Sequence, residues 1–226
     1  MIKPHNVRKR ESCLSGRCIP RDTMSPRTFN ADGSRAKGKR MSFFTMEHSK
    51  AAYRIDFALY GIAVVLLAAF LLVAGPRGQR LEITVFVGVG LVSWTLIEYA
   101  LHRFVMHALQ PFRRWHAEHH QRPTALICTP TILSATLIAT LVFLPTLVLS
   151  GNLLRACALT LGVLIGYLFF SITHHAIHHW RANSSWLKHR KRWHALHHHA
   201  IGESGYFGVT SVFWDQVFES VSRQRK

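Results

Sequence analysis

The hydrophobic positions of the chain gather into four long apolar segments: 57–74, 81–100, 125–149 and 153–171. Each is close to the ~20 apolar residues that a helix needs to cross the hydrocarbon core of a bilayer. The first segment stops at Gly75-Pro76, a pair that ends helices, while the third contains Pro130 and Pro145. Four such segments in one short chain predict an all-α membrane protein rather than a soluble protein with buried helices.

The segments pair through two very short connections, residues 75–80 and 150–152, which predicts two helical hairpins. Of the 28 Lys and Arg residues, only Arg77, Arg80 and Arg155 fall on the side of these connections. Positively charged residues concentrate on the cytoplasmic side of membrane proteins. We therefore expect a multi-pass protein of a bacterial inner membrane or the endoplasmic reticulum, with both termini and the middle loop in the cytoplasm.

Residues 1–50 differ from the rest of the chain. They are rich in Arg, Lys, Ser and Gly and show no apolar period, which predicts a disordered basic tail. We interpret this tail as an over-extended gene start, with Met41 or Met46 as the first residue of the protein. A transit peptide is the alternative, because the tail contains few acidic residues. Residues 51–226 then form one membrane domain.

The composition first indicates another class of protein. The net charge is +17, and a soluble protein this basic would be a candidate for binding nucleic acid. Hydrophobic residues make up 49% of the chain and charged residues only 17%, however, and the membrane topology accounts for much of the charge. The basic side can rest against anionic lipid headgroups, and we expect no nucleic-acid partner. The four cysteines form no CxxC pair, so a zinc ribbon or a disulfide framework is not indicated.

Histidine is the residue type that stands out. All but His5 and His48 of the 16 histidines follow the second or fourth apolar segment, on the predicted cytoplasmic side. The octet RRWHAEHH at 113–120 recurs as KRWHALHH at 191–198. The spaced groups are His102 and His107; His116, His119 and His120; His174 and His178; and His194, His197 and His198.

The spacings indicate metal binding by helices. Residues at i, i+3 and i+4 flank one stripe of a helix, so each HxxHH group is expected to aim three imidazoles at one point. An HxxxH pair aims two imidazoles at one point. Within HHAIHH this pair could equally be His174 and His178 or His175 and His179. The HxxxxH pair, His102 and His107, is separated by about 140° on a straight helix. That pair needs a helix end, a distortion, or a metal approached from both sides.

Ten histidines are too many for one ion, because a tetrahedral zinc takes about four ligands. Two ions with about five nitrogens each would use them all. Imidazole suits zinc, copper, iron and nickel, so the ligands alone do not select the metal. Metal-bound imidazoles need neighbours that fix their orientation. Glu98, four residues before His102, is the candidate for this role, with Glu118 and Asp215 as further candidates.

Two stretches carry a more specific pattern: WTLIEYALHRFVMH at 94–107 and HHHAIGESGYFGVTSVFWDQVF at 197–218. With the four histidine groups, they resemble the fatty acid hydroxylase and sterol desaturase superfamily, and most closely its fatty acid 2-hydroxylase branch. The resemblance covers roughly residues 55–220. It implies four transmembrane helices, a cytoplasmic histidine-lined dimetal centre and O2-dependent hydroxylation of C–H bonds in lipid chains.

Carried over by position, the resemblance implies ten metal ligands and favours the His174/His178 pair. The ligands are His102, His107, His116, His119, His120, His174, His178, His194, His197 and His198. Hydroxylating an unactivated C–H bond requires a strong oxidant, which a redox metal with O2 supplies and side chains do not. We therefore expect two iron ions with O2 as co-substrate. Zinc can appear in the purified protein, because it binds such sites more tightly than ferrous iron.

These expectations combine into a di-iron hydroxylase acting on the acyl chain of a fatty acid or membrane lipid, with 2-hydroxylation favoured. The alternatives within the superfamily are a sterol, carotenoid or headgroup hydroxylase, or a desaturase. A membrane metal transporter or sensor is the alternative of another class, but the centres of the apolar segments lack His, Asp and Glu. The haem motif His-Pro-Gly-Gly of fused cytochrome domains is absent. We therefore expect a separate electron donor, cytochrome b5-like or ferredoxin-type.

Overall fold

The computed structural model describes residues 47–199 and 205–221. The predicted tail lies outside these residues except for its last positions, and so do both candidate starts, Met41 and Met46. The described residues form helices and one isolated bridge, between Glu47 and Ile127.

Four helices are long and apolar enough to cross a membrane, which confirms the predicted all-α fold with four spans. The first span is α1 (Lys50–Ala74), and the second joins η1 (Arg77–Gln79), α2 (Arg80–Ala100) and η2 (Leu101–Met106). The third joins α4 (Thr131–Ile138), η3 (Ala139–Phe143) and α5 (Leu144–Ser150), and the fourth is α6 (Leu153–His179). Three shorter helices complete the described part: α3 (Phe112–Gln121), α7 (Ser185–His199) and α8 (Phe213–Val217).

The ends of the spans differ from the apolar segments for local reasons. Helix α1 begins before its apolar stretch because the Ser49 hydroxyl caps it, accepting a hydrogen bond of 3.2 Å from the Ala52 amide. The third span begins only after Pro130, which has an extended conformation. Pro145 has no amide hydrogen to donate to the carbonyl one turn earlier, and the π-helix η3 ends two residues before it.

Helix α6 is the most buried of the four spans and packs against α1, α2 and α5. Its contact with α2 depends on two facing glycines, Gly90 and Gly162. A Cβ atom on Gly90 would lie 2.2 Å from the Leu159 carbonyl oxygen, and one on Gly162 would lie 2.1 Å from that of Val87. The two backbones therefore approach more closely than any side chain allows, as small residues permit in membrane bundles.

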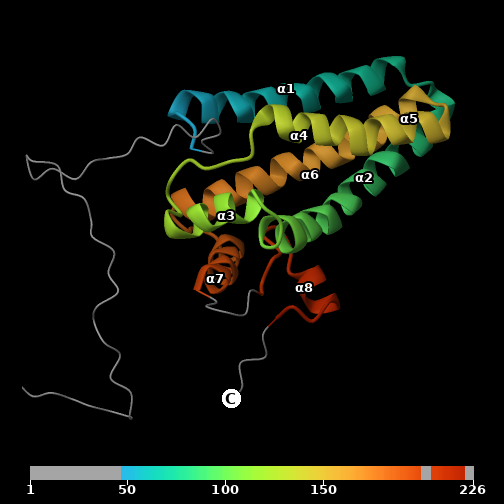
Figure 1. Ribbon diagram of the computed structural model, residues 1–226. Coiled ribbons are helices and arrows are strands. Elements are labelled where there is room, and N and C mark those ends of the chain that lie inside the picture. Colours follow the sequence, from blue (N-terminus) through green and yellow to red (C-terminus); the bar gives the residue numbers. More distant parts are fainter. Residues whose placement is uncertain (1–46, 200–204, 222–226) are drawn as a thin grey trace, which may run out of the picture. The chain divides into compact units, whose positions relative to one another are not determined.

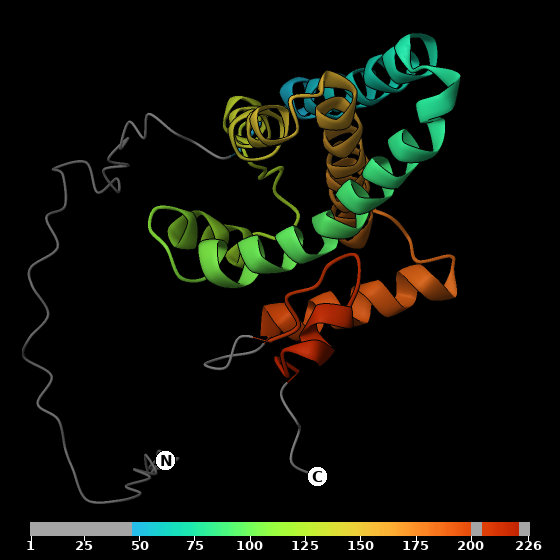
Figure 2. The same ribbon diagram turned by 90° about the vertical axis from the view of Figure 1, so that its right-hand side faces the viewer.

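The outer faces of the spans are apolar and exposed. Val73 and Leu149, for example, are 88% and 87% exposed. Exposing such apolar faces to water would be unfavourable in free energy, whereas lipid tails are as apolar as these side chains and impose no such penalty. Figure 1 shows α3, α7 and α8 near the end of the spans where α2 and α6 finish, and Figure 2 shows the same arrangement from the side. The histidine groups all lie at that end.

Candidate metal centre

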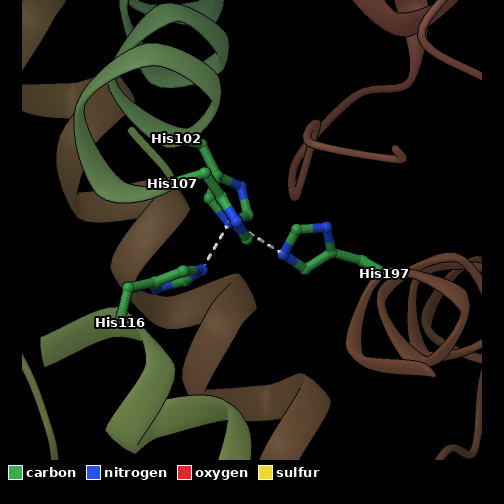
Figure 3. Close-up of side chains that lie close together, drawn as sticks. All are labelled: His102, His107, His116 and His197. Carbon is green, nitrogen blue, oxygen red and sulfur yellow. Dashed lines mark hydrogen bonds between the residues drawn. The ribbon is translucent and has the colours of Figure 1, made fainter. Parts of the chain in front are cut away.

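The histidine groups converge from four elements into two neighbouring clusters. The first cluster contains His102 from η2, His107 directly after η2, His116 from α3 and His197 from α7 (Figure 3). The second cluster contains His119 from α3, His174 and His178 from α6, and His194 from α7. Within each cluster, one nitrogen from every imidazole lies within 4.8 Å of the others.

The two remaining histidines of the predicted set extend these clusters. The Nε2 atom of His120 lies 2.9 Å from that of His116 and 3.1 Å from that of His197, in the first cluster. The Nε2 atom of His198 lies 2.9 Å from that of His194, in the second. Each cluster therefore gathers five imidazoles, and all ten predicted histidines lie in one cluster or the other.

The HxxxxH pair is brought together by a distortion of the helix. Residues Leu101–Met106 form a π-helix, whose hydrogen bonds join residues five apart. The wider turn removes the large angle that separates His102 and His107 on a straight α-helix. Their ring centroids lie 5.3 Å apart. Two of the three possibilities that the spacing left open are observed together: a helix distortion, and a helix end at Met106, directly before His107.

The HxxHH groups behave differently from the expectation that three imidazoles would aim at one point. On α3, His116 and His120 belong to the first cluster while His119 belongs to the second. On α7, His194 and His198 belong to the second cluster, and His197 to the first. Positions i+3 and i+4 lie about 100° apart around a helix, on opposite sides of position i. Each group therefore divides between two clusters, and α3 and α7 serve both.

Two backbone carbonyls fix the tautomers in the first cluster. The Nδ1 atom of His102 lies within hydrogen-bond distance of the Phe207 carbonyl oxygen, and that of His197 lies 2.8 Å from the Gly205 carbonyl oxygen. A carbonyl only accepts hydrogen bonds, so Nδ1 must donate in both. In the neutral rings the unprotonated Nε2 then faces the cluster, as in proteins whose imidazoles bind a metal.

The segment that carries these carbonyls is held by two buried carboxylates. Glu98 accepts hydrogen bonds of 2.8 Å from the backbone amides of Val209 and Thr210, and another from the Thr210 hydroxyl. Asp215 is fully buried and accepts from the amides of Phe207 (2.8 Å) and Gly208 (2.7 Å). We name residues 205–210 the carbonyl loop.

Glu98 was the sequence candidate for orienting an imidazole, and among the described residues it bonds to the carbonyl loop instead of to a ring. It can therefore act on His102 only through the loop. Glu118, a weaker candidate, pairs with Arg122 at 2.6 Å on the surface.

Gly208 in the carbonyl loop is required by close packing, since a Cβ there would lie 1.8 Å from the Ser211 carbonyl oxygen. Sequence reasoning missed the two loop carbonyls, because backbone atoms carry no residue signature.

Burial and crowding keep the imidazoles neutral. Burial, followed by the neighbouring His120 and Arg113, lowers the pKa of His107 to about 4. Burial and His178 lower the pKa of His119 to about 3, and burial lowers that of His197 to about 3 despite its bond to Gly205. Neutral rings offer lone pairs at physiological pH, which is the form that binds metals.

The second cluster fits a metal for a further reason. Both ring nitrogens of His119 and Nδ1 of His194 are buried without a hydrogen-bond partner among the described residues. A buried polar atom left without a partner costs about 1–3 kcal/mol. Coordination of a metal would satisfy one of the two nitrogens of His119. In His194 the atom that faces the cluster is Nε2, which lies 2.9 Å from the Nε2 atoms of His178 and His198. The residues present therefore fit two metal ions, each with imidazole ligands.

His175, His179, His189 and His199, which lie outside the predicted set, belong to neither cluster. His175 faces α1, where its Nδ1 lies 3.2 Å from the Tyr53 hydroxyl, and it stacks on His179. His189 bonds to Trp193, and His199 is exposed at the end of α7. The HHAIHH sequence therefore places His174 and His178, rather than His175 and His179, in the second cluster.

Two cavities border the clusters. The smaller, about 110 Å³, lies against α1 and is bordered by His116 and His119; we name it the α1 cavity. The larger, about 380 Å³, is lined mainly by apolar side chains of α2, η2 and the third span; we name it the apolar cavity. Six residues line both cavities: His102, Met106, Phe112, Thr129, Tyr167 and Phe170. The two cavities therefore adjoin at the first histidine cluster.

These features define a multi-span helical protein with two adjoining histidine clusters of metal-binding geometry. Residues 87–220, more than half of the chain, match the fatty acid hydroxylase family, and the chain belongs to that family. This confirms the resemblance seen in the sequence. The match begins within α2 and therefore leaves out α1.

Curated relatives agree with this assignment. The chain is 36% identical over 148 residues to the dihydroceramide fatty acyl 2-hydroxylase FAH2 of Arabidopsis thaliana, a match covering 61% of the chain and 60% of the relative. It is 34% identical over 149 residues to the ceramide very long chain fatty acid hydroxylase scs7 of Schizosaccharomyces pombe. That match covers 60% of the chain and 42% of the relative. The fatty acid 2-hydroxylase of Rattus norvegicus is 31% identical over 154 residues, and the match covers 61% of the chain and 40% of the relative. The matches span at most about 60% of these relatives.

A solved structure is also similar. The hydroxylase domain visible in full-length scs7p superimposes with a TM-score of 0.63 at 27% sequence identity. The match covers 75% of this chain and 66% of that one. With the four apolar helices, these relatives identify a multi-pass membrane protein of a lipid hydroxylase family.

Proposed function

We propose that this protein is an O2-dependent di-iron hydroxylase that inserts oxygen at C2 of the acyl chain of a fatty acid or membrane lipid. The observation that carries the proposal is the position of the first histidine cluster where the two cavities adjoin, with the second cluster bordering the α1 cavity. The names of the relatives, which are fatty acyl and fatty acid 2-hydroxylases, support the same substrate class and position.

The ten imidazoles of the two clusters would hold the two iron ions, five to each. Bound iron supplies the redox chemistry that activates O2 towards an unactivated C–H bond, which side chains alone cannot do. One oxygen atom enters the C–H bond and the other leaves as water, which consumes two electrons and two protons. The carbonyl loop holds the Nε2 lone pairs of His102 and His197 towards the metal position before the reaction begins.

The cavities provide positioning of the substrate. The apolar cavity is lined by Leu133, Leu137 and Leu141 and suits a hydrocarbon chain. The α1 cavity, which shares His102 with the apolar cavity, contains polar groups from Tyr53 and Asp56. A lipid with its chain in the apolar cavity and its polar end in the α1 cavity would bring the carbons next to the polar end to the histidine clusters. This arrangement supports oxidation at C2 rather than far along the chain.

The excess of Lys and Arg at the end that carries the histidines supports a cytoplasmic centre. Electrons would then arrive from a separate cytoplasmic donor, cytochrome b5-like or ferredoxin-type. The metal transporter or sensor finds no support in the described residues, since the clusters lie at one end of the spans instead of along a path across them.

The proposal is tested by expressing the chain in a host without 2-hydroxylated lipids and analysing its lipids by mass spectrometry. We expect acyl chains that have gained one oxygen at C2, derived from heavy-isotope O2, and loss of this product in His197→Ala. His199→Ala is the matched control, because His199 is exposed and outside both clusters. Chains that have lost two hydrogens instead would identify a desaturase, and an unchanged lipid profile would contradict the proposal.

A further inference from the structure

Helix α8 has two sides of opposite character. One side carries Asp215, which is fully buried and accepts hydrogen bonds from two amides of the carbonyl loop. The other side carries Phe213 and Val217, which lie four residues apart on the helix and are each about half exposed. Phe218, directly after α8, is also about half exposed. Three large apolar side chains therefore stand uncovered next to the segment that orients the first histidine cluster.

The contacts of α8 place it against the second span. The Trp214 indole donates a hydrogen bond of 2.9 Å to the Thr95 hydroxyl, and the Phe218 ring stacks on that of Tyr99 with centroids 5.4 Å apart. Thr95 and Tyr99 lie in the last part of α2, before the span continues through η2. Figure 1 shows α8 on the side of α2 that is turned away from α1. The short helix therefore lies alongside a membrane span, not beyond its end.

The apolar face of α2 leads directly to this contact. Val85, Val89, Val92 and Leu96 follow one another at intervals of three or four residues, which places them on one side of the helix. Each is between 40% and 66% exposed, as expected of side chains that face lipid. Tyr99 is the next position of this series, but it is only 1% exposed because the segment around α8 covers it. The uncovered side of α8 therefore continues the lipid-facing surface of the second span.

The residue types around α8 suit the boundary between lipid headgroups and acyl chains. Trp214 combines an apolar ring with one polar N–H group, and Trp and Tyr are enriched at membrane interfaces. The Arg103 guanidinium lies over the rings of Tyr99 and Phe104, a position from which a long cationic side chain can reach headgroup phosphates. An apolar side bordered by such groups is typical of segments that lie in the plane of the interface.

We propose that α8 and Phe218 form an interfacial anchor, which inserts Phe213, Val217 and Phe218 into the lipid at the headgroup boundary beside the second span. Through Asp215 the same anchor holds the carbonyl loop, whose carbonyls orient two rings of the first histidine cluster. The bilayer thereby contributes to the order of that cluster. The inference goes beyond the proposed function and does not depend on which reaction the protein catalyses.

Photochemical labelling tests the lipid contact. Benzoylphenylalanine is placed at Phe213 or Phe218 of the full chain, which is reconstituted into vesicles of phosphatidylcholine and phosphatidylglycerol. We expect irradiation to attach a phospholipid at either position, in a yield comparable with that at Val89 on the lipid-facing side of α2. Ala117, exposed on the polar helix α3, is the matched control and should give no lipid adduct. Mass spectrometry of the digested protein identifies each adduct.

Other partners would give different adducts. Labelling of a second copy of the chain at residue 213 would identify a protein interface, and labelling of another segment of the same chain would identify an internal contact. Either result would overturn the inference. Lipid labelling at Val89 but not at residues 213 and 218 would do the same, since it would show an inserted protein whose α8 does not meet the bilayer.

Hydrogen–deuterium exchange at the Phe207 and Gly208 amides tests the coupling to the loop, in the same vesicles. Phe213→Ser combined with Val217→Ser should speed exchange of these amides about tenfold, because the anchor loses part of its apolar burial. Phe213→Leu combined with Val217→Leu keeps the side apolar and should match the wild type. Gln216→Ser, a change at an exposed polar position of the same helix, is the further control. Exchange across α6 should stay unchanged in every variant.

Unchanged exchange in the double serine variant would overturn the coupling, since the loop would then be held without help from the bilayer. Equally fast exchange in the double leucine variant would overturn it as well, because the exact packing of α8 and not its apolar character would control the loop. Neither measurement requires turnover or a bound metal. A chain that inserts α8 as expected but oxidises no lipid would refute the proposed function alone.

Discussion

The two histidine clusters hold equal numbers of imidazoles but are supported in different ways. In the first, backbone carbonyls of the carbonyl loop bond to His102 and His197 from outside. In the second, both nitrogens of His119 lack a partner among the described residues, and the rings are placed by the packing of α3, α6 and α7. The first cluster is thus pre-organised by a dedicated loop, whereas the second depends on helix positions. The two clusters should therefore respond differently to changes in the loop.

The largest effects should come from removing one ring from each cluster. We expect His197→Ala and His178→Ala each to lower hydroxylation by more than about 100-fold, because even changes outside the ligand set cost roughly 10–100-fold at metal sites. Metal analysis should give about two ions per chain in the wild type and about one in each variant. A variant that loses its metal but remains active would show that its cluster is not part of the reactive centre.

The next largest effect should separate the clusters. Asp215→Ala leaves the buried amides of Phe207 and Gly208 without acceptors, which should lower the free energy of unfolding by about 2–4 kcal/mol. The loop would then release His102 and His197. We expect one of the two metal ions to exchange with a chelator about 10–100-fold more readily, while the other is retained. Equal weakening of both ions would mean that the loop supports the whole centre.

A milder change at the other end of the loop should give a smaller effect of the same kind. Glu98→Gln keeps a carbonyl oxygen for the amides of Val209 and Thr210 but loses the charge that strengthens these bonds. The expected cost is about 1 kcal/mol, visible as a lower melting temperature in detergent. Metal loss should again be confined to one ion. If Glu98→Gln lowered activity with both ions still firmly bound, Glu98 would have a role beyond holding the loop.

The fold and the histidine set were predictable because both depend on local spacing. Segment length alone predicted four spans, and the repeated octets marked α3 and α7 as equivalent elements. The division of each HxxHH group between two clusters could not be predicted, since it depends on how α3 and α7 lie relative to α6 and η2. The π-helix at Leu101–Met106 follows from no propensity in LHRFVM, although the HxxxxH spacing named a distortion as one of three possibilities there.

The partners of Glu98 and Asp215 were beyond sequence reasoning for another reason. Both residues were candidates for orienting a ring, but their acceptor atoms meet backbone amides of a loop that is distant in sequence from Glu98. Nothing in the sequence marks a backbone amide as the partner of a carboxylate. Asp56 was passed over because it stands at the polar edge of an apolar segment, where an acidic residue is unremarkable. Its burial against Thr131 depends on the packing of α1 near the third span.

The smallest expected effect concerns the histidines that the sequence alone left ambiguous. His174 and His175 are neighbours on α6, yet His174 lies in the second cluster while His175 bonds to Tyr53 on α1. His175→Ala should therefore leave metal content unchanged and lower activity less than about twofold, as expected for a side chain away from the centre. His174→Ala, its matched counterpart, should lose about one metal ion and most activity. Loss of metal in His175→Ala would mean that α6 presents its other face to the centre, and the second cluster would have to be rebuilt around His175 and His179.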